Sequence, residues 1–240
     1  VRLFDGRGGE WTALIARMKP TVHVVLDRFD PATKSPDLRV TLVQGLPAAD
    51  KMDWVVQKAV ELGVAAIRPV VAKRSVVRLS AEKMERRHEH WRNVVIAACE
   101  QCGANIVPVV APLLDLPQSL AQAPTDNETR LLMLPGEAPR MRDLPKPAGS
   151  VTILVGPEGG FEEDEIGIAL LAGFKPLSFG PRVLRTETAG PAAVAHRRPV
   201  RRSSRDADPK GVVGDVYRST EATLVDLGED VEPLRPVLAC

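Results

Sequence analysis

Two stretches of the chain read VTILVGPEGGF, at residues 151–161, and PLSFGPRVLRTET, at residues 176–188. Each begins with a short apolar run, Val151 to Val155 and Pro176 to Phe179, which is typical of a buried strand. A glycine-bearing loop follows each run, and glycine lets a ligand approach the backbone where a Cβ would otherwise stand. Ligands of open α/β sheets bind beyond the carboxyl ends of the strands, so the sequence predicts that the two loops form one pocket.

The segment between residues 38 and 155 alternates between strand and helix patterns. Two helices are expected: one is capped by Asp50 and stopped by Gly63, and a longer one begins near Ser80 and ends at Gly103. This alternation predicts an α/β fold with a mostly parallel sheet and flanking helices. The predicted strands are residues 38–43, 67–71, 106–110, 130–134 and 151–155.

The two ends of the chain depart from this pattern. The first 33 residues alternate and turn like a small β-structure, with a hairpin signal at residues 5–9 and a linker at residues 30–36. Because the chain opens on Val1 rather than on Met, we expect the first strands of that structure to be missing. From His196 the chain is basic and broken by proline, so residues 196–240 are expected to form an atypical, poorly ordered tail.

Composition limits the class of protein. The 240 residues include 32 basic and 31 acidic side chains, and no apolar run approaches the ~18 residues of a membrane span. Three cysteines give no paired framework, which favours a reducing, cytoplasmic setting. Cys99 and Cys102 have the C-x-x-C spacing but no second pair, so we expect them to pack rather than to bind metal. Aromatic residues make up only 4% of the chain, which argues against base-stacking RNA modules.

The residues after the first loop exclude two common phosphate sites. A P-loop needs Lys and Ser or Thr directly after its glycines, and the dinucleotide fingerprint G-x-G-x-x-G is absent. Four acids, Glu162 to Glu165, follow instead and fall in the first turn of the next helix, where they would repel phosphate. A ligand with an adenosine but no phosphates fits the loops better.

These two loops resemble the paired signature of the bacterial 16S ribosomal RNA uridine-N3 methyltransferases, the RsmE family of the SPOUT class. The likeness extends to residues 44–63, 74–77 and 91–103, and runs from about residue 1 to 195. It implies a SPOUT-type knotted, mostly parallel sheet at residues 37–195, preceded at residues 1–33 by a truncated PUA-like β-barrel, in a homodimer. It also implies a cytoplasmic enzyme that uses S-adenosylmethionine to methylate N3 of a uridine in 16S rRNA of the 30S subunit.

The resemblance implies roles for particular side chains. Arg185 is expected to stabilise negative charge on the uracil carbonyls, Glu187 to orient that arginine or accept a proton, and Arg182 is the third catalytic candidate. The expected cofactor-binding residues are Leu134, Val155, Gly156, Pro157, Glu158, Gly159, Gly160, Phe179, Gly180, Val183, Leu184 and Thr188. The expected RNA contacts are Arg7, Arg74, Arg78, Arg86 and Arg87, and no metal ligand is expected.

Other interpretations remain open at this point. The chain could be a knotted methyltransferase with another RNA target. It could also be an RNA-binding protein inactivated by its altered C-terminus. The helical pattern after Thr186 is not sustained beyond Ala195, and Pro191 suits only a first helical turn. Arg182 and Arg185 could be solvated or paired with Glu187. The basic residues between 73 and 92 could form a solvated face rather than a phosphate-contact surface. Trp54 and Trp91 are expected to be packing anchors.

Overall fold

The computed structural model describes residues 1–48, 50–75, 80–136, 138–145, 147, 149–197 and 237–239. They fall into two compact units. The first contains residues 1–35, residues 96–107 and the terminal strand, and the second contains the described parts of residues 36–95 and 108–199. Predicted features between residues 198 and 236 and at Arg78 lie outside the described residues.

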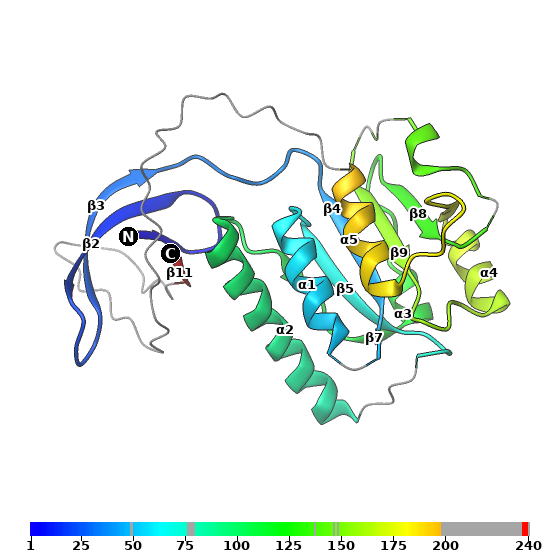
Figure 1. The fold of residues 1–240 in the computed structure, drawn as a ribbon, viewed down its shortest axis with the longest axis horizontal. Coiled ribbons are helices and arrows are strands. Elements are labelled where there is room, and N and C mark those ends of the chain that lie inside the picture. The colour runs from blue at the N-terminus through cyan, green and yellow to red at the C-terminus, as the bar shows by residue number, and fades with distance from the viewer. Residues whose placement is uncertain are drawn as a thin grey trace. The chain divides into compact units, whose positions relative to one another are not determined.

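The second unit is built on a parallel sheet, whose strands run in colour from the blue β4 to yellow in Figure 1. Its described strands follow the order β10-β8-β9-β4-β5-β6, with β7 also paired to β5, and each of these pairs is parallel. The parallel sheet predicted from the sequence is therefore confirmed, although the strands expected at 106–110 and 176–179 are shorter than predicted. The strands are β4 (Val40–Gly45), β5 (Ala66–Val71), β6 (Val109–Val110), β7 (Leu114–Asp115), β8 (Thr129–Met133), β9 (Val151–Val155) and β10 (Lys175–Leu177).

The centre of this sheet is buried on both faces, which explains its continuous apolar sequence. All five residues of β9 are buried, and β9 lies between β8 and β4. Side chains from four strands, among them Leu132 and Leu154, pack with Phe161 and Phe174 from the segments around α4 (Glu163–Leu171). The loops that leave the carboxyl ends of the strands are thus anchored to the core.

Helix α1 (Lys51–Glu61) starts and ends where the sequence predicts. Gly63 ends it with a positive φ of 80°, but the side chain of Asp50 makes no capping hydrogen bond, so that part of the prediction is wrong. Trp91, on α2 (Ala81–Cys102), is 1% exposed and packs as expected. Trp54, on α1, is 45% exposed, so its assignment as a buried anchor is wrong.

Helix α5 (Thr186–Arg197) packs against α1 and across β4 and β9 (Figure 1). Pro191 lies inside this helix rather than in its first turn, contrary to the prediction. Proline has no N–H, so the Glu187 carbonyl lacks its usual helical donor, and burial of α5 on the sheet offsets that loss. The helix also continues through His196 and Arg197, past the end that the sequence predicts. The short helices α3 (Leu116–Leu120) and η1 (Met141–Asp143) complete this unit.

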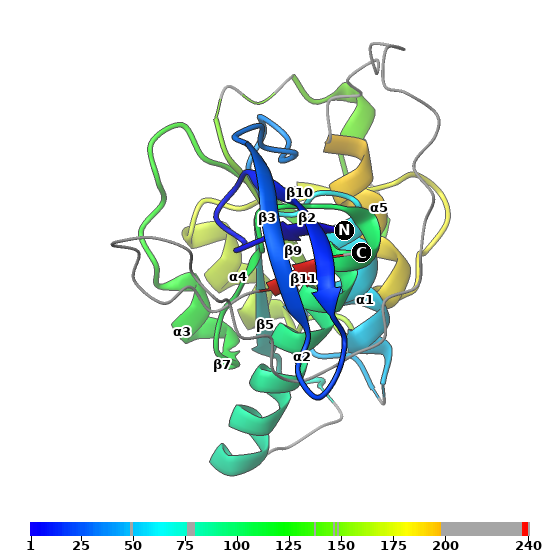
Figure 2. The ribbon, with the colours of Figure 1, turned by 90° about the vertical axis from the view of Figure 1, so that its left-hand side faces the viewer.

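The first unit contains an antiparallel sheet of β1 (Arg2–Phe4), β2 (Glu10–Arg17) and β3 (His23–Asp30), seen face-on in Figure 2. The predicted hairpin is confirmed, since Gly6, Gly8 and Gly9 have positive φ in the β1–β2 loop. β11 (Val237–Ala239) pairs with β1, so these three residues form a strand within the tail for which no element was predicted. Buried Asn105 completes the unit, because its side chain accepts the Lys34 N–H and donates to the Ala32 carbonyl.

The prediction that both described cysteines pack holds for Cys99 and is wrong for Cys102. Cys99 is buried, and that burial raises the pKa of its thiol to about 12, whereas Cys102 is exposed. Within the described ranges, no group of three His, Cys, Asp or Glu residues lies close enough to hold a metal ion. A search of the same ranges finds no helix with the length and apolar character needed to cross a membrane.

Candidate active site

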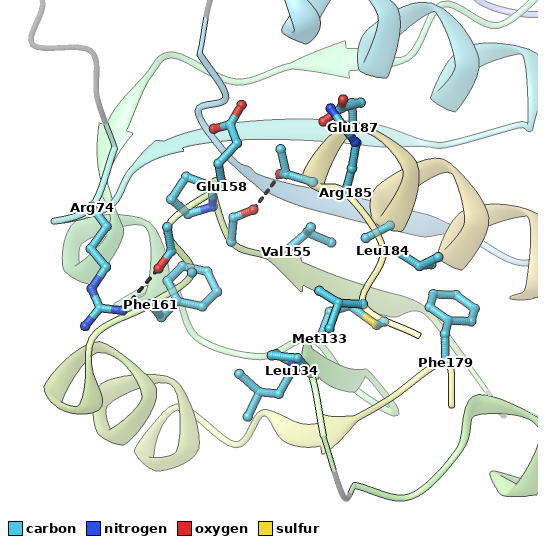
Figure 3. A pocket seen from close by; sticks show the side chains of 18 of the residues that line it. Arg74, Met133, Leu134, Val155, Glu158, Phe161, Phe179, Leu184, Arg185 and Glu187 are labelled. Atoms are coloured by element: carbon cyan, nitrogen blue, oxygen red, sulfur yellow. Dashed lines mark hydrogen bonds between the residues drawn. The ribbon is translucent and has the colours of Figure 1, made fainter. Parts of the chain in front are cut away.

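A pocket of about 700 Å³ lies where the carboxyl ends of β8, β9 and β10 meet the start of α5. This volume is typical of a small-molecule site. Both predicted loops line it, which confirms that they form one pocket (Figure 3). All the predicted cofactor-binding residues except Thr188 line it, and so do the catalytic candidates Arg182, Arg185 and Glu187. Lining residues that the sequence did not single out include Lys51, Met133, Phe161 and Thr186.

The first loop approaches the end of β4 very closely. A Cβ on Gly45 would lie 2.6 Å from the Pro157 nitrogen, so only glycine fits there. Within the loop, the Gly160 N–H donates to the Pro157 carbonyl at 2.9 Å, and Gly160 has a positive φ of 70°. The loop is therefore a tight turn that β4 supports from behind.

The helix that follows this loop is closed to phosphate. Glu162 and Glu165 form a capping box, in which the Glu162 N–H donates to the Glu165 carboxylate at 2.9 Å. The free N–H groups that would otherwise bind an anion at the start of α4 are thus partly satisfied internally. Glu163 and Asp164 are also in the first turn, so the start of α4, next to the pocket-lining Phe161, is acidic as the sequence predicts.

Thr186 joins the second loop to the first. Its hydroxyl donates to the Gly156 carbonyl at 2.5 Å and accepts from the Gln44 side-chain N–H at 2.9 Å. Gln44 is fully buried at the end of β4, where an amide side chain interrupts an apolar strand. That interruption was the available sequence signal for Gln44, and the resulting chain of hydrogen bonds fixes the two loops relative to each other.

Lys51 lies between two carboxylates at the edge of the pocket. Its Nζ is 3.0 Å from Glu158 Oε1 and 3.5 Å from Glu187 Oε1. The hydrogen bond to Glu158 is the main reason why the pKa of Lys51 lies above its ordinary value. Burial alone would raise the pKa of Glu158, but hydrogen bonds from Lys51 and the Ala48 N–H outweigh it and place that pKa below its usual value. Nothing in the local sequence of α1 signals this contact.

The predicted RNA-contact arginines are distributed over both units. Arg74 lines the pocket, and its guanidinium donates to the Gly159 carbonyl at 3.1 Å (Figure 3). On α2, Arg86 pairs with Glu82 at 2.6 Å and Arg87 is half-buried. Arg7 belongs to the first unit, where its backbone forms an isolated antiparallel β-bridge with Ile106.

The fold and pocket are those of an RNA methyltransferase domain, and the family model of that description matches residues 33–197. Ribosomal RNA small subunit methyltransferase E of Buchnera aphidicola is 33% identical over 72% of this chain and 70% of its own length. The Bacillus subtilis protein of that name is 34% identical over 63% of this chain and 62% of its own length, so the chain spans less than two thirds of that relative. The chain belongs to the ribosomal RNA small subunit methyltransferase E family.

A solved structure shares the fold. The Neisseria gonorrhoeae ribosomal RNA small subunit methyltransferase E, bound to S-adenosyl methionine, matches with a TM-score of 0.75 and 38% identity, over 81% of this chain and 80% of that one. The predicted SPOUT-type class, a mostly parallel sheet with flanking helices, is thereby confirmed. The antiparallel strands β1, β2 and β3 fit part of a PUA-like barrel.

Proposed function

We propose that residues 37–195 form a methyltransferase domain that transfers a methyl group from S-adenosylmethionine to N3 of a uridine in 16S rRNA of the small ribosomal subunit, in the cytoplasm. The observation that carries this proposal is the single pocket formed by the loops after β9 and β10. Family membership and the S-adenosyl methionine bound to the Neisseria relative support it. The substrate and the activity are proposed for this chain by analogy with its relatives, the ribosomal RNA small subunit methyltransferases E.

The pocket suits this cofactor on its own chemistry. S-adenosylmethionine supplies an electrophilic methyl group on a sulfonium and carries no phosphate, in keeping with the acidic, capped start of α4. Leu134, Val155 and Leu184 offer an apolar wall for the adenine ring, and the glycine loops expose backbone N–H and C=O groups to its polar edge. The remaining predicted cofactor residues line the same space, and Thr188 is left out of this assignment.

The charged side chains of the pocket suit a uracil. Uridine N3 carries a proton at neutral pH, so methylation there requires a group that accepts the proton and one that stabilises the resulting anion. Figure 3 shows Arg185 and Glu187 beside each other at the start of α5. We assign proton acceptance to Glu187 and charge stabilisation to Arg185, with Arg182 nearby on the same loop.

Labelled-methyl transfer tests this function. The chain should transfer methyl groups from S-adenosylmethionine to small subunits that lack the modification, and nuclease digestion followed by chromatography should give 3-methyluridine. Naked 16S rRNA serves as the comparison substrate. Product on another RNA would indicate a different target, and calorimetry without cofactor binding would favour an RNA-binding protein without activity.

We also propose that the chain acts as a homodimer. Trp54 supports this, because it exposes 45% of its surface on α1, beside α5, and a large exposed aromatic side chain often marks an interface. Light scattering should give the mass of two chains, and Trp54→Glu should shift it to one. Leu171→Glu is the matched control: Leu171 is also exposed, but it lies at the end of α4 rather than on α1, so its substitution should leave the mass unchanged. A single-chain mass for the unmodified protein would contradict the proposal.

RNA affinity should depend strongly on salt if the remaining arginines contact phosphates. We assign Arg7, Arg86 and Arg87 to such contacts, because each lies outside the pocket and carries a permanent positive charge. Arg74 has a second role, since its guanidinium already holds the Gly159 carbonyl.

A further inference from the structure

The two carboxylates that flank Lys51 differ in how fully they are paired. Both oxygens of Glu158 accept the Ala48 N–H, at 3.1 and 3.2 Å, and Oε1 also accepts from Lys51. Among the described residues, the carboxylate of Glu187 forms an ion pair with Lys51 alone, through Oε1. Its Oε2 is shielded from water and has no hydrogen-bond partner among the described residues. Glu187 is therefore the carboxylate with a free acceptor position.

An unpaired carboxylate oxygen out of contact with water is an unfavourable arrangement. It gains a hydrogen bond when a donor enters the pocket and displaces the side chains that cover Oε2, and the N3–H of a uracil is such a donor. Glu187 lines the pocket from the first turn of α5, where the helix dipole also favours its negative charge. Glu158 is less suited to this task, because its oxygens are already occupied.

The lysine that holds Glu187 comes from a different element. Lys51 is the first residue of α1, whereas Glu158 lies in the loop after β9 and Glu187 on α5. An ammonium has three N–H donors, so one lysine can bridge both carboxylates. The contact with Glu158 at 3.0 Å anchors Lys51, and the anchored ammonium limits the rotation of Glu187.

We propose that Lys51 is a positioning residue for methyl transfer, which holds Glu187 through Oε1 so that the other carboxylate oxygen can take the proton from uridine N3. This inference rests on the proposed function and adds to it the residue that orients the base. Lys51 itself need not touch the substrate.

The step balances without a further reactant. The N3–H bond breaks and its proton goes to the Glu187 carboxylate, forming an O–H bond. N3 keeps the electron pair and forms the N–CH₃ bond, while the pair of the methyl–sulfur bond remains on sulfur, leaving a neutral thioether. Glu187 then releases the proton to water.

The test is a double-mutant cycle on kcat at saturating cofactor and small subunits. Glu187→Gln should lower kcat about 100-fold, at the low end of the range found for general acid–base groups, and Lys51→Met should lower it less, about 30-fold, because the base itself remains. Because Lys51 acts through Glu187, adding Lys51→Met to Glu187→Gln should change kcat by less than about twofold. Lys51→Arg, which can still bridge two carboxylates, should restore kcat to within about fivefold of the unmodified protein.

A matched control lies on the same helix. Lys58 pairs with Glu61 at 2.7 Å and does not line the pocket, so Lys58→Met removes a comparable ion pair and should leave kcat unchanged. Calorimetry of each variant with S-adenosylmethionine supplies a readout independent of turnover, and Lys51→Met should bind it within about threefold of the unmodified protein.

Each other result has a defined meaning. Independent, multiplying effects of Lys51→Met and Glu187→Gln would overturn the positioning role, and so would a tenfold loss of cofactor affinity in Lys51→Met. An unchanged kcat in Lys51→Met, with the unmodified protein active, would reject this inference alone. If the unmodified protein binds cofactor but transfers no methyl group to any RNA, the proposed function fails and the inference fails with it.

Discussion

Replacing Arg185 with alanine is expected to lower kcat for methyl transfer about 100-fold, the loss typical when a group that stabilises developing negative charge is removed. Arg185 lines the pocket beside Glu187, at the turn that leads into α5 (Figure 3). Its guanidinium is a fixed positive charge with several N–H donors, suited to the carbonyl oxygens of a uracil that has lost its N3 proton. The measurement is the rate of 3-methyluridine formation with cofactor and small subunits at saturation.

Two controls separate chemistry from binding. Calorimetry should show that Arg185→Ala binds S-adenosylmethionine within about threefold of the unmodified protein, because the arginine acts on the base to be methylated. Arg185→Lys keeps the charge but loses the planar fork, so it should recover part of the rate. A kcat for Arg185→Ala within threefold of the unmodified value would contradict the proposal that Arg185 stabilises negative charge on the uracil.

Gly45→Ala is expected to weaken cofactor binding strongly, through steric overlap alone. The added Cβ would lie 2.6 Å from the Pro157 nitrogen, 2.7 Å from Pro157 Cδ and 2.9 Å from the Gly156 carbonyl carbon. These are backbone and ring atoms that cannot rotate away, so the loop after β9 must move as a whole. Overpacking of this kind costs about 1–3 kcal/mol of unfolding free energy. Calorimetry should show about a 100-fold loss of S-adenosylmethionine affinity, or about 2.7 kcal/mol, because residues 156–160 of the displaced loop line the pocket.

Gly167→Ala is the matched control for that substitution. Gly167 lies inside α4, and a Cβ there would meet no atom within 4 Å. Alanine at such a helical position should raise the free energy of unfolding by about 0.5–1 kcal/mol and leave cofactor affinity unchanged. Denaturant titrations of the two variants give the comparison, and full cofactor affinity in Gly45→Ala would contradict the close approach of β4 and the loop.

The sequence predicted the parts of this site that depend on local pattern. The apolar run from Val151 to Val155 predicted a buried strand, and all five of its residues are buried. The glycines after it predicted a turn that leaves the backbone open. The acids from Glu162 to Glu165 likewise predicted a helix start that rejects phosphate, and the capping box is there. In each case the property is encoded by neighbours in the chain.

The features that were missed depend on contacts between distant segments. Lys51 looks like any surface lysine at a helix start until Glu158 and Glu187 lie beside it. Trp54 has the spacing of a core residue, yet packing leaves it exposed. Proline is strongly disfavoured inside helices, yet Pro191 lies inside α5, where burial of the helix on the sheet offsets the cost. Local propensity carries no information about such tertiary choices.

The hydroxyl of Thr186 has a consequence for how the protein is made. Synthesis runs from the N-terminus, so Gln44 and Gly156 leave the ribosome before the residue that ties them together. A nascent chain that ends before Thr186 can pair β4 with β9, but it lacks the hydroxyl that connects Gln44 to the loop after β9. The pocket is therefore expected to be completed late in translation, once the start of α5 has emerged.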